Sequence, residues 1–319
     1  MLKTRIITAL ILVSLVVLTT IFLEPVWFLF ISSLFILVGI WEWFKLFSSR
    51  VDGHIHYFGI FPVVFIYFIG QPISFVLSNY SISTVYLFEH SPVFYVVIYL
   101  SLAFFWLVIA PLMIINYQKK LFFNPYLTIT DLKGKRPWSD LTIGPEGTWM
   151  NFFLGNFLLW GMWLNLVILL FNNPYILLFL FLIIWSADIA AYFSGKKYGK
   201  HTLADNVSPS KTWEGVIGGL IAGILTAFLA LHFFREFLGV DMIQASPIKL
   251  ILLSSVTVIY SIVGDLFISI IKRDAGKKDT GILFPGHGGV LDRIDSLMAG
   301  SVAFMFWGIF LDLFDFGLL

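Results

Sequence analysis

Long hydrophobic runs fill most of this chain, and short polar segments separate them. A helix needs roughly 20 apolar residues to cross the hydrocarbon core of a bilayer. The pattern predicts about nine transmembrane helices, near residues 6–23, 26–47, 57–77, 93–115, 149–171, 175–194, 214–236, 248–271 and 296–316. We therefore expect an all-α polytopic membrane protein.

Composition agrees with this prediction, because 59% of the residues are hydrophobic, 12% are charged and the mean hydropathy is +0.92. Such a chain is too apolar for a water-soluble domain. No polar segment is long enough to form a soluble domain, so we expect a single integral membrane domain over residues 1–319. Within it, residues 1–186 form N-terminal helices whose sequence patterns are less specific. Residues 187–296 carry the polar motifs expected to be catalytic, and residues 296–316 form the last transmembrane helix.

The positive charges are divided unevenly between the two sides of the predicted spans. Of the 20 lysines and arginines, only Arg235 and Lys249 fall on one side. Cytoplasmic loops are enriched in these residues. The division predicts a cytoplasmic N-terminus and cytoplasmic motif loops, with the C-terminus outside. The chain has no cysteine, which excludes disulfides and thiolate sites.

Among the acids within the predicted spans, three mark candidate positions, namely Glu42, Asp188 and Asp265. Charged groups inside a membrane are costly and mark functional positions. Each acid lies toward the cytoplasmic end of its helix. We therefore predict a polar cavity that opens to the cytoplasm.

Charge is concentrated between Ser269 and Ser296. Basic side chains suit phosphate oxygens, and aspartates suit a hard cation such as magnesium, so the two together indicate a nucleotide. Asp265, Ser269 and Lys272 are spaced at i, i+4 and i+7, which places them on one helix face. The basic residues are Lys272, Arg273, Lys277, Lys278 and Arg293, and the aspartates considered are Asp265, Asp279, Asp292 and Asp295.

A second polar segment covers residues 187–215. Asp188 and Tyr192 share a helix face, and Gly195 is predicted to end that helix as a C-cap. Ser208 and Pro209 are predicted to be the N-cap and first-turn proline of the seventh span. Lys211 and Thr212 would then lie beside free backbone amides that favour an anion.

Together these segments resemble the phosphatidate cytidylyltransferase family, also called CDP-diacylglycerol synthases. The family signature runs from a serine through Lys-Arg and Lys-Asp pairs to a Pro-x-His-Gly-Gly turn and an Asp-Arg-x-Asp ending. Here it consists of Ser269, Lys272, Arg273, Lys278, Asp279, Pro285, His287, Gly288, Gly289, Asp292, Arg293 and Asp295. Other elements that resemble the family are Trp41-Glu42-Trp43, the Asp188 helix with its Tyr-Gly-Lys turn, Gly264-Asp265 and the run from Ser208 to Gly215.

The resemblance implies that CTP and phosphatidic acid within the bilayer give CDP-diacylglycerol and pyrophosphate. It implies Asp265 and Asp292 as ligands of magnesium, and it leaves open a second, monovalent cation and a homodimer. The residues it marks as catalytic are Asp265, Ser269, Lys272, Arg273, Lys278, Asp279, His287, Asp292, Arg293 and Asp295. Those it marks as substrate-binding are Asp188, Tyr192, Lys200, Ser208, Lys211, Thr212, Glu214, Gly288 and Gly289.

The expected partners are CTP, phosphatidic acid and membrane lipids, with no nucleic acid, and the expected location is the bacterial cytoplasmic (inner) membrane. Three alternatives stay open at this point: transfer to a different lipid phosphate, an anion transporter, and a catalytically silent homologue. A transporter would be expected to show charges near mid-bilayer and an inverted repeat. Neither is evident in the sequence.

Overall fold

A computed structural model describes residues 2–48, 92–119, 145–284 and 288–314, and these are almost entirely helical. In chain order the elements are α1 (Leu2–Val17), the π-helical turn η1 (Leu18–Phe22), α2 (Pro25–Ser48), α5 (Pro92–Phe104), the π-helical turn η3 (Phe105–Ile109), α6 (Ala110–Lys119), α8 (Pro145–Asn172), α9 (Pro174–Tyr198), β1 (Thr202–Ala204), β2 (Ser208–Thr212), α10 (Trp213–Leu238), α11 (Pro247–Asp274) and α12 (Leu291–Phe310).

Six helical stretches in the described part of the chain are long and apolar enough to cross a membrane. They are Pro25–Leu46, Val96–Gln118, Phe153–Asn172, Pro174–Tyr198, Trp213–Leu238 and Pro247–Asp274. The first predicted span corresponds to α1 and η1, which contain only a shorter apolar stretch, and the last corresponds to α12. The span predicted at 57–77 lies outside the described residues. The chain is thus a mostly helical, polytopic membrane protein.

The seventh span does not begin as the sequence suggested, and the fold is not purely helical. Ser208 and Pro209 lie in β2, which pairs antiparallel with β1. The residue before a proline favours extended backbone, and a two-stranded sheet has only edge strands, where proline is tolerated. The N-cap of α10 is instead Thr212, whose hydroxyl accepts a hydrogen bond from Gly215 N at 3.1 Å.

Gly195 does not end its helix either. Helix α9 continues to Tyr198, and Gly199 follows it. A Cβ on Gly195 would lie 3.0 Å from Thr212 Oγ1 and 3.7 Å from the Cα of Gly215. The glycine therefore serves close packing of α9 against the start of α10, as small residues do between membrane helices.

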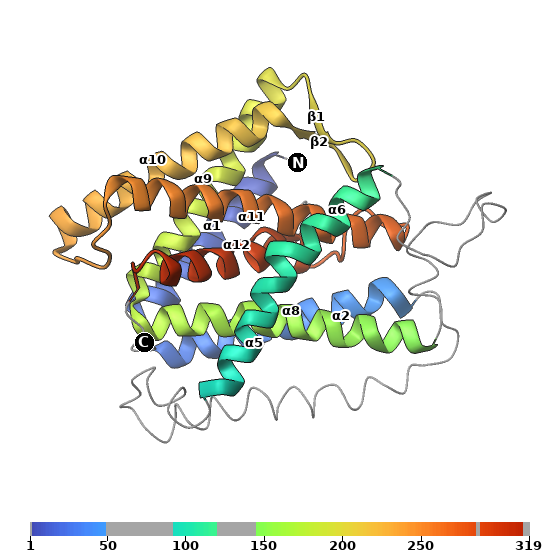
Figure 1. Cartoon of the computed structure of the whole chain (residues 1–319), viewed down its shortest axis with the longest axis horizontal. Helices are drawn as coiled ribbons and strands as arrows, with labels where there is room; N and C mark the ends of the chain where they lie inside the picture. Colours follow the sequence, from blue (N-terminus) through green and yellow to red (C-terminus); the bar gives the residue numbers. More distant parts are fainter. Residues whose placement is uncertain (1, 49–91, 120–144, 285–287, 315–319) are drawn as a thin grey trace.

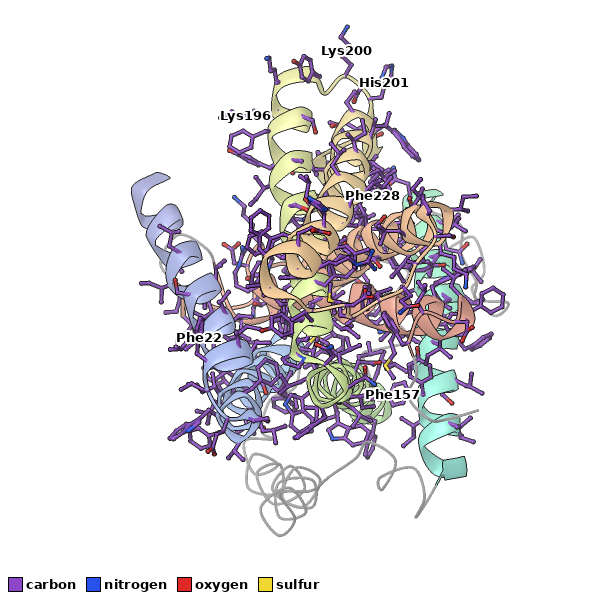
Figure 2. All side chains as sticks on the ribbon, turned by 90° about the vertical axis from the view of Figure 1, so that its left-hand side faces the viewer. Phe22, Phe157, Lys196, Lys200, His201 and Phe228 are labelled. Carbon is purple, nitrogen blue, oxygen red and sulfur yellow. The ribbon has the colours of Figure 1, made fainter. Side chains whose placement is uncertain are left out.

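The helices form two groups (Figure 1). Helices α2, α8, α11 and α12 run side by side, and the segment from α5 to α6 crosses them. Helices α9 and α10 pack together and extend beyond this layer, with the β1–β2 hairpin at their end. Figure 2 shows the same separation, because Lys200 and His201 lie at the far end from Phe157 of α8.

Hydrogen bonds made by side chains attach the turn of the hairpin to α6 and α11. Asn206 Nδ2 donates to the backbone oxygen of Gln118 in α6 at 2.9 Å, and Arg273 Nε of α11 donates to the carbonyl of Val207 at 3.3 Å. Val207 itself is fully buried. The hairpin is consequently held against α11, so that β2 can present a side chain to that helix.

Candidate functional site

The centre of the candidate site is a buried ion pair between α11 and α12. Lys272 Nζ lies 2.7 Å from Asp292 Oδ1, and the two side chains are only 10% and 5% exposed. Asp292 Oδ2 accepts hydrogen bonds from the backbone amides of Thr280 at 2.8 Å and Gly289 at 2.9 Å. The carboxylate is thus fixed on one side by the loop and faces a cation on the other.

A second ion pair joins the hairpin to α11. Lys211 Nζ of β2 lies 2.5 Å from Asp265 Oδ2, and Ser269 Oγ donates to Asp265 Oδ1 at 3.3 Å. Lys272 also lies within electrostatic range of Asp265. The predicted face of Asp265, Ser269 and Lys272 is therefore confirmed, and the two ion pairs are neighbours.

Further charged groups surround these pairs. Asp188 of α9 has Asp265, Lys211 and Arg293 as electrostatic neighbours, and Ser296 lies beside it. Asp295 of α12 is in turn close to Asp265, Lys272 and Arg293. Helices that are far apart in the sequence therefore bring acids and bases of both polar segments together.

Close packing of α11 on α12 makes this arrangement possible. A Cβ added to Gly264 would collide with the backbone oxygen of Asp295 and would lie 3.2 Å from the Cβ of Ala299. Helix α12 begins at Leu291, before the predicted position 296, so Asp292 and Asp295 lie in its first turns and not in the preceding loop. The missing side chain at Gly264 lets this turn approach Asp265.

Several other predicted site residues are not themselves partners in the two ion pairs. Glu214 contacts His201, with 2.7 Å between Glu214 Oε1 and His201 Nδ1. Thr212 caps α10, and Arg273 contacts the hairpin. The side chains of Tyr192, Lys200, Lys278, Asp279 and Arg293 are exposed, whereas Ser208 and Gly288 are half-buried and Gly289 is buried. His287 lies outside the described residues, and the substrate-binding roles of this set stay predictions.

Two residues outside the predicted catalytic and substrate-binding sets contact the site directly. Glu42 of α2 is buried, and Thr280 Oγ1 donates to its Oε2 at 2.8 Å. The same hydroxyl lies 3.0 Å from Asp292 Oδ2. Glu42 was singled out as a costly acid within a span, but nothing in the sequence marked Thr280.

The charged groups suit magnesium in one particular way. The described residues contain no group of three or more acidic or histidine side chains placed to hold a metal. Magnesium, however, is commonly held by one or two carboxylates together with the phosphates of a substrate. Asp265 and Asp292 are two carboxylates of the kind this mode needs, and in the structure each is paired with a lysine.

Comparison with known proteins decides the family. A family model described as the cytidylyltransferase family matches residues 3–311. This chain belongs to the cytidylyltransferase family. A phosphatidate cytidylyltransferase of Haemophilus influenzae is 34% identical over 322 residues, which cover 97% of this chain and 99% of the relative. One of Pseudomonas aeruginosa is 34% identical over 308 residues, covering 95% and 96% of the two chains.

The cytidylyltransferase match extends well beyond the motifs. A Brucella suis phosphatidate cytidylyltransferase is 44% identical over a shorter stretch of 135 residues, which covers 42% of this chain and 47% of the relative. The family predicted from the signature at Ser269–Asp295 is thus confirmed. The family model and the two long matches also include the N-terminal helices, for which the sequence patterns alone were less specific.

Proposed function

We propose that this cytidylyltransferase is a magnesium-dependent phosphatidate cytidylyltransferase of the bacterial inner membrane. It transfers CMP from CTP to phosphatidic acid and gives CDP-diacylglycerol and pyrophosphate. The observation that carries the proposal is the pair of neighbouring ion pairs, Lys211–Asp265 and Lys272–Asp292, in a chain that matches relatives of this name over almost their whole length.

The reaction needs alignment of two anions more than it needs a base. A phosphate monoester has a second pKa near 6, so phosphatidate is largely a dianion at pH 7. One of its oxygens attacks the α-phosphorus of CTP, and the bond from that phosphorus to the bridging oxygen breaks as pyrophosphate leaves. The protein must hold the attacking and leaving oxygens roughly in line and neutralise the developing charge.

Lys211 and Lys272 are suited to that neutralisation. Each ammonium lies on a carboxylate in the structure, at 2.5 and 2.7 Å, and its hydrogen atoms can turn to phosphate oxygens when a nucleotide enters. Magnesium, held by Asp265 and Asp292 together with the triphosphate, would supply further charge neutralisation. Ser269 Oγ, which donates to Asp265 Oδ1, orients that carboxylate and is not a nucleophile.

The membrane geometry completes the proposal. Both pairs involve the C-terminal half of α11, so the headgroup of phosphatidate can meet CTP at the end of this helix while its acyl chains stay among the spans. We propose that the two ion pairs lie in a polar cavity that opens to the cytoplasm, in a chain with about nine spans and its C-terminus outside, because of the uneven distribution of lysine and arginine. A homodimer and a monovalent cation remain predictions.

The experiment follows the transferred group. Purified protein in detergent is given magnesium, phosphatidic acid and CTP labelled at the α-phosphorus, and the lipids are extracted and separated. The proposal predicts label in a lipid that co-migrates with CDP-diacylglycerol. Label that appears only with another lipid phosphate would support the alternative acceptor, and CTP or phosphate flux in proteoliposomes without any labelled lipid would support a transporter.

A further inference from the structure

Glu42 of α2 contacts the loop between α11 and α12, although the two lie far apart in the sequence. Glu42 is 1% exposed, and its carboxylate accepts hydrogen bonds from Thr280 Oγ1 at 2.8 Å, Val290 N at 3.0 Å and Leu291 N at 2.9 Å. We propose that Glu42 is a positioning residue for cytidylyl transfer, which acts by holding Asp292 in place. This inference rests on the proposed function.

Helix α12 lacks a cap of its own. Its N-cap residue is Val290, whose side chain cannot accept a hydrogen bond. The first amides of a helix have no partners within the helix, and a negative group near them is favoured. Glu42 provides, from another helix, acceptors for two of these first amides, those of Val290 and Leu291.

The same contacts determine the position of Asp292. One of its oxygens, Oδ2, accepts from Gly289 N and Thr280 N, and the two residues that follow Gly289, Val290 and Leu291, donate their amides to Glu42. The Thr280 hydroxyl lies between the two carboxylates, at 2.8 Å from Glu42 Oε2 and 3.0 Å from Asp292 Oδ2. Glu42 thus holds the backbone segment whose amide binds Asp292 Oδ2. The other oxygen, Asp292 Oδ1, faces Lys272.

The loop is shaped to surround this carboxylate. A Cβ on either Gly281 or Gly289 would collide with a side-chain oxygen of Glu42. Both glycines therefore let the backbone approach the acid closely from two sides. The arrangement makes the position of α12, and of the charged residues in its first turns, depend on an acid of α2.

The test replaces Glu42 by glutamine, which keeps the size but turns an NH2 group toward one of the two backbone amides. Residues that orient the groups of a metal site typically change activity 10- to 100-fold. We expect kcat per folded molecule to fall in about this range, with an unchanged KM for phosphatidate. The matched control is Glu236→Gln, an exposed acid of α10, which should keep wild-type kcat. A wild-type kcat in Glu42→Gln would overturn the proposal.

A second pair of variants covers the case in which Glu42→Gln does not fold. Thr280→Val removes the hydroxyl between the two carboxylates, and Thr280→Ser keeps it. We expect Thr280→Val to lose kcat and Thr280→Ser to retain most of it. Equal activity in the two variants would contradict the inference.

Amide hydrogen exchange separates this inference from the proposed function. Residues 288–295 should exchange faster in Glu42→Gln than in the wild type, while α9 and α10 stay unchanged. If the wild-type chain makes no CDP-diacylglycerol, the proposed function fails, and exchange alone still tests whether Glu42 holds this segment. Unchanged exchange at 288–295 would refute the positioning role whether or not the chain is active.

Discussion

Replacing Lys272 by methionine would leave Asp292 as a buried carboxylate without its cation. The two groups are 2.7 Å apart, and their side chains are 10% and 5% exposed, so little water can solvate the carboxylate in place of the ammonium. Removing one partner of such a pair costs about 3–5 kcal/mol of stability. Asp292 keeps its hydrogen bonds from the amides of Thr280 and Gly289, so we expect a loss near the lower end, about 3 kcal/mol.

The assay is unfolding of the purified protein in detergent, with two matched variants beside Lys272→Met. Lys278→Met removes an exposed lysine of the adjoining loop and should change stability by no more than about 0.5 kcal/mol. The double variant Lys272→Met with Asp292→Asn contains neither charge and should be more stable than Lys272→Met alone. Lys272→Met with wild-type stability, or a double variant less stable than the single one, would refute the reasoning.

Three further predictions concern the charges and the helix packing. Asp265→Asn and Asp292→Asn should each abolish pyrophosphate release while the protein stays folded and inserted, as judged by a turnover assay beside size-exclusion chromatography; retained turnover in both would contradict the metal assignment. Chelation by EDTA should stop turnover and added magnesium should restore it, so turnover that persists in EDTA would argue against magnesium. Gly264→Ala should destabilise the fold by about 1–3 kcal/mol, because its Cβ would collide with the Asp295 carbonyl. Thermal unfolding tests this against Gly39→Ala, whose Cβ would meet only ordinary contacts at 3.6 Å or more, and equal effects would contradict the packing argument.

Local patterns in the sequence predicted what depends on local spacing. The helical face of Asp265, Ser269 and Lys272 follows from a 3.6-residue repeat, and the structure bears it out. The positions of the described spans follow in the same way from runs of apolar residues, because a helix must be long enough to cross the bilayer.

Contacts between distant segments had no such signal. Thr280 and Glu42 are separated by 238 positions, and no spacing rule connects them. The prediction that Ser208 and Pro209 begin a helix was wrong, because a Ser-Pro pair suits both a helix start and an extended edge strand. Pairing of β2 with β1 favours the strand here. Gly195 misled for a similar reason, since a glycine that permits helix packing looks like one that ends a helix.

The most direct test of the account is nucleotide dependence of pyrophosphate release. Purified, detergent-solubilised protein would be given magnesium, phosphatidic acid and each of the four ribonucleoside triphosphates in turn. The account predicts release with CTP, and only when phosphatidic acid is present. A folded protein that releases pyrophosphate with none of the four, or with CTP regardless of the lipid, would contradict it.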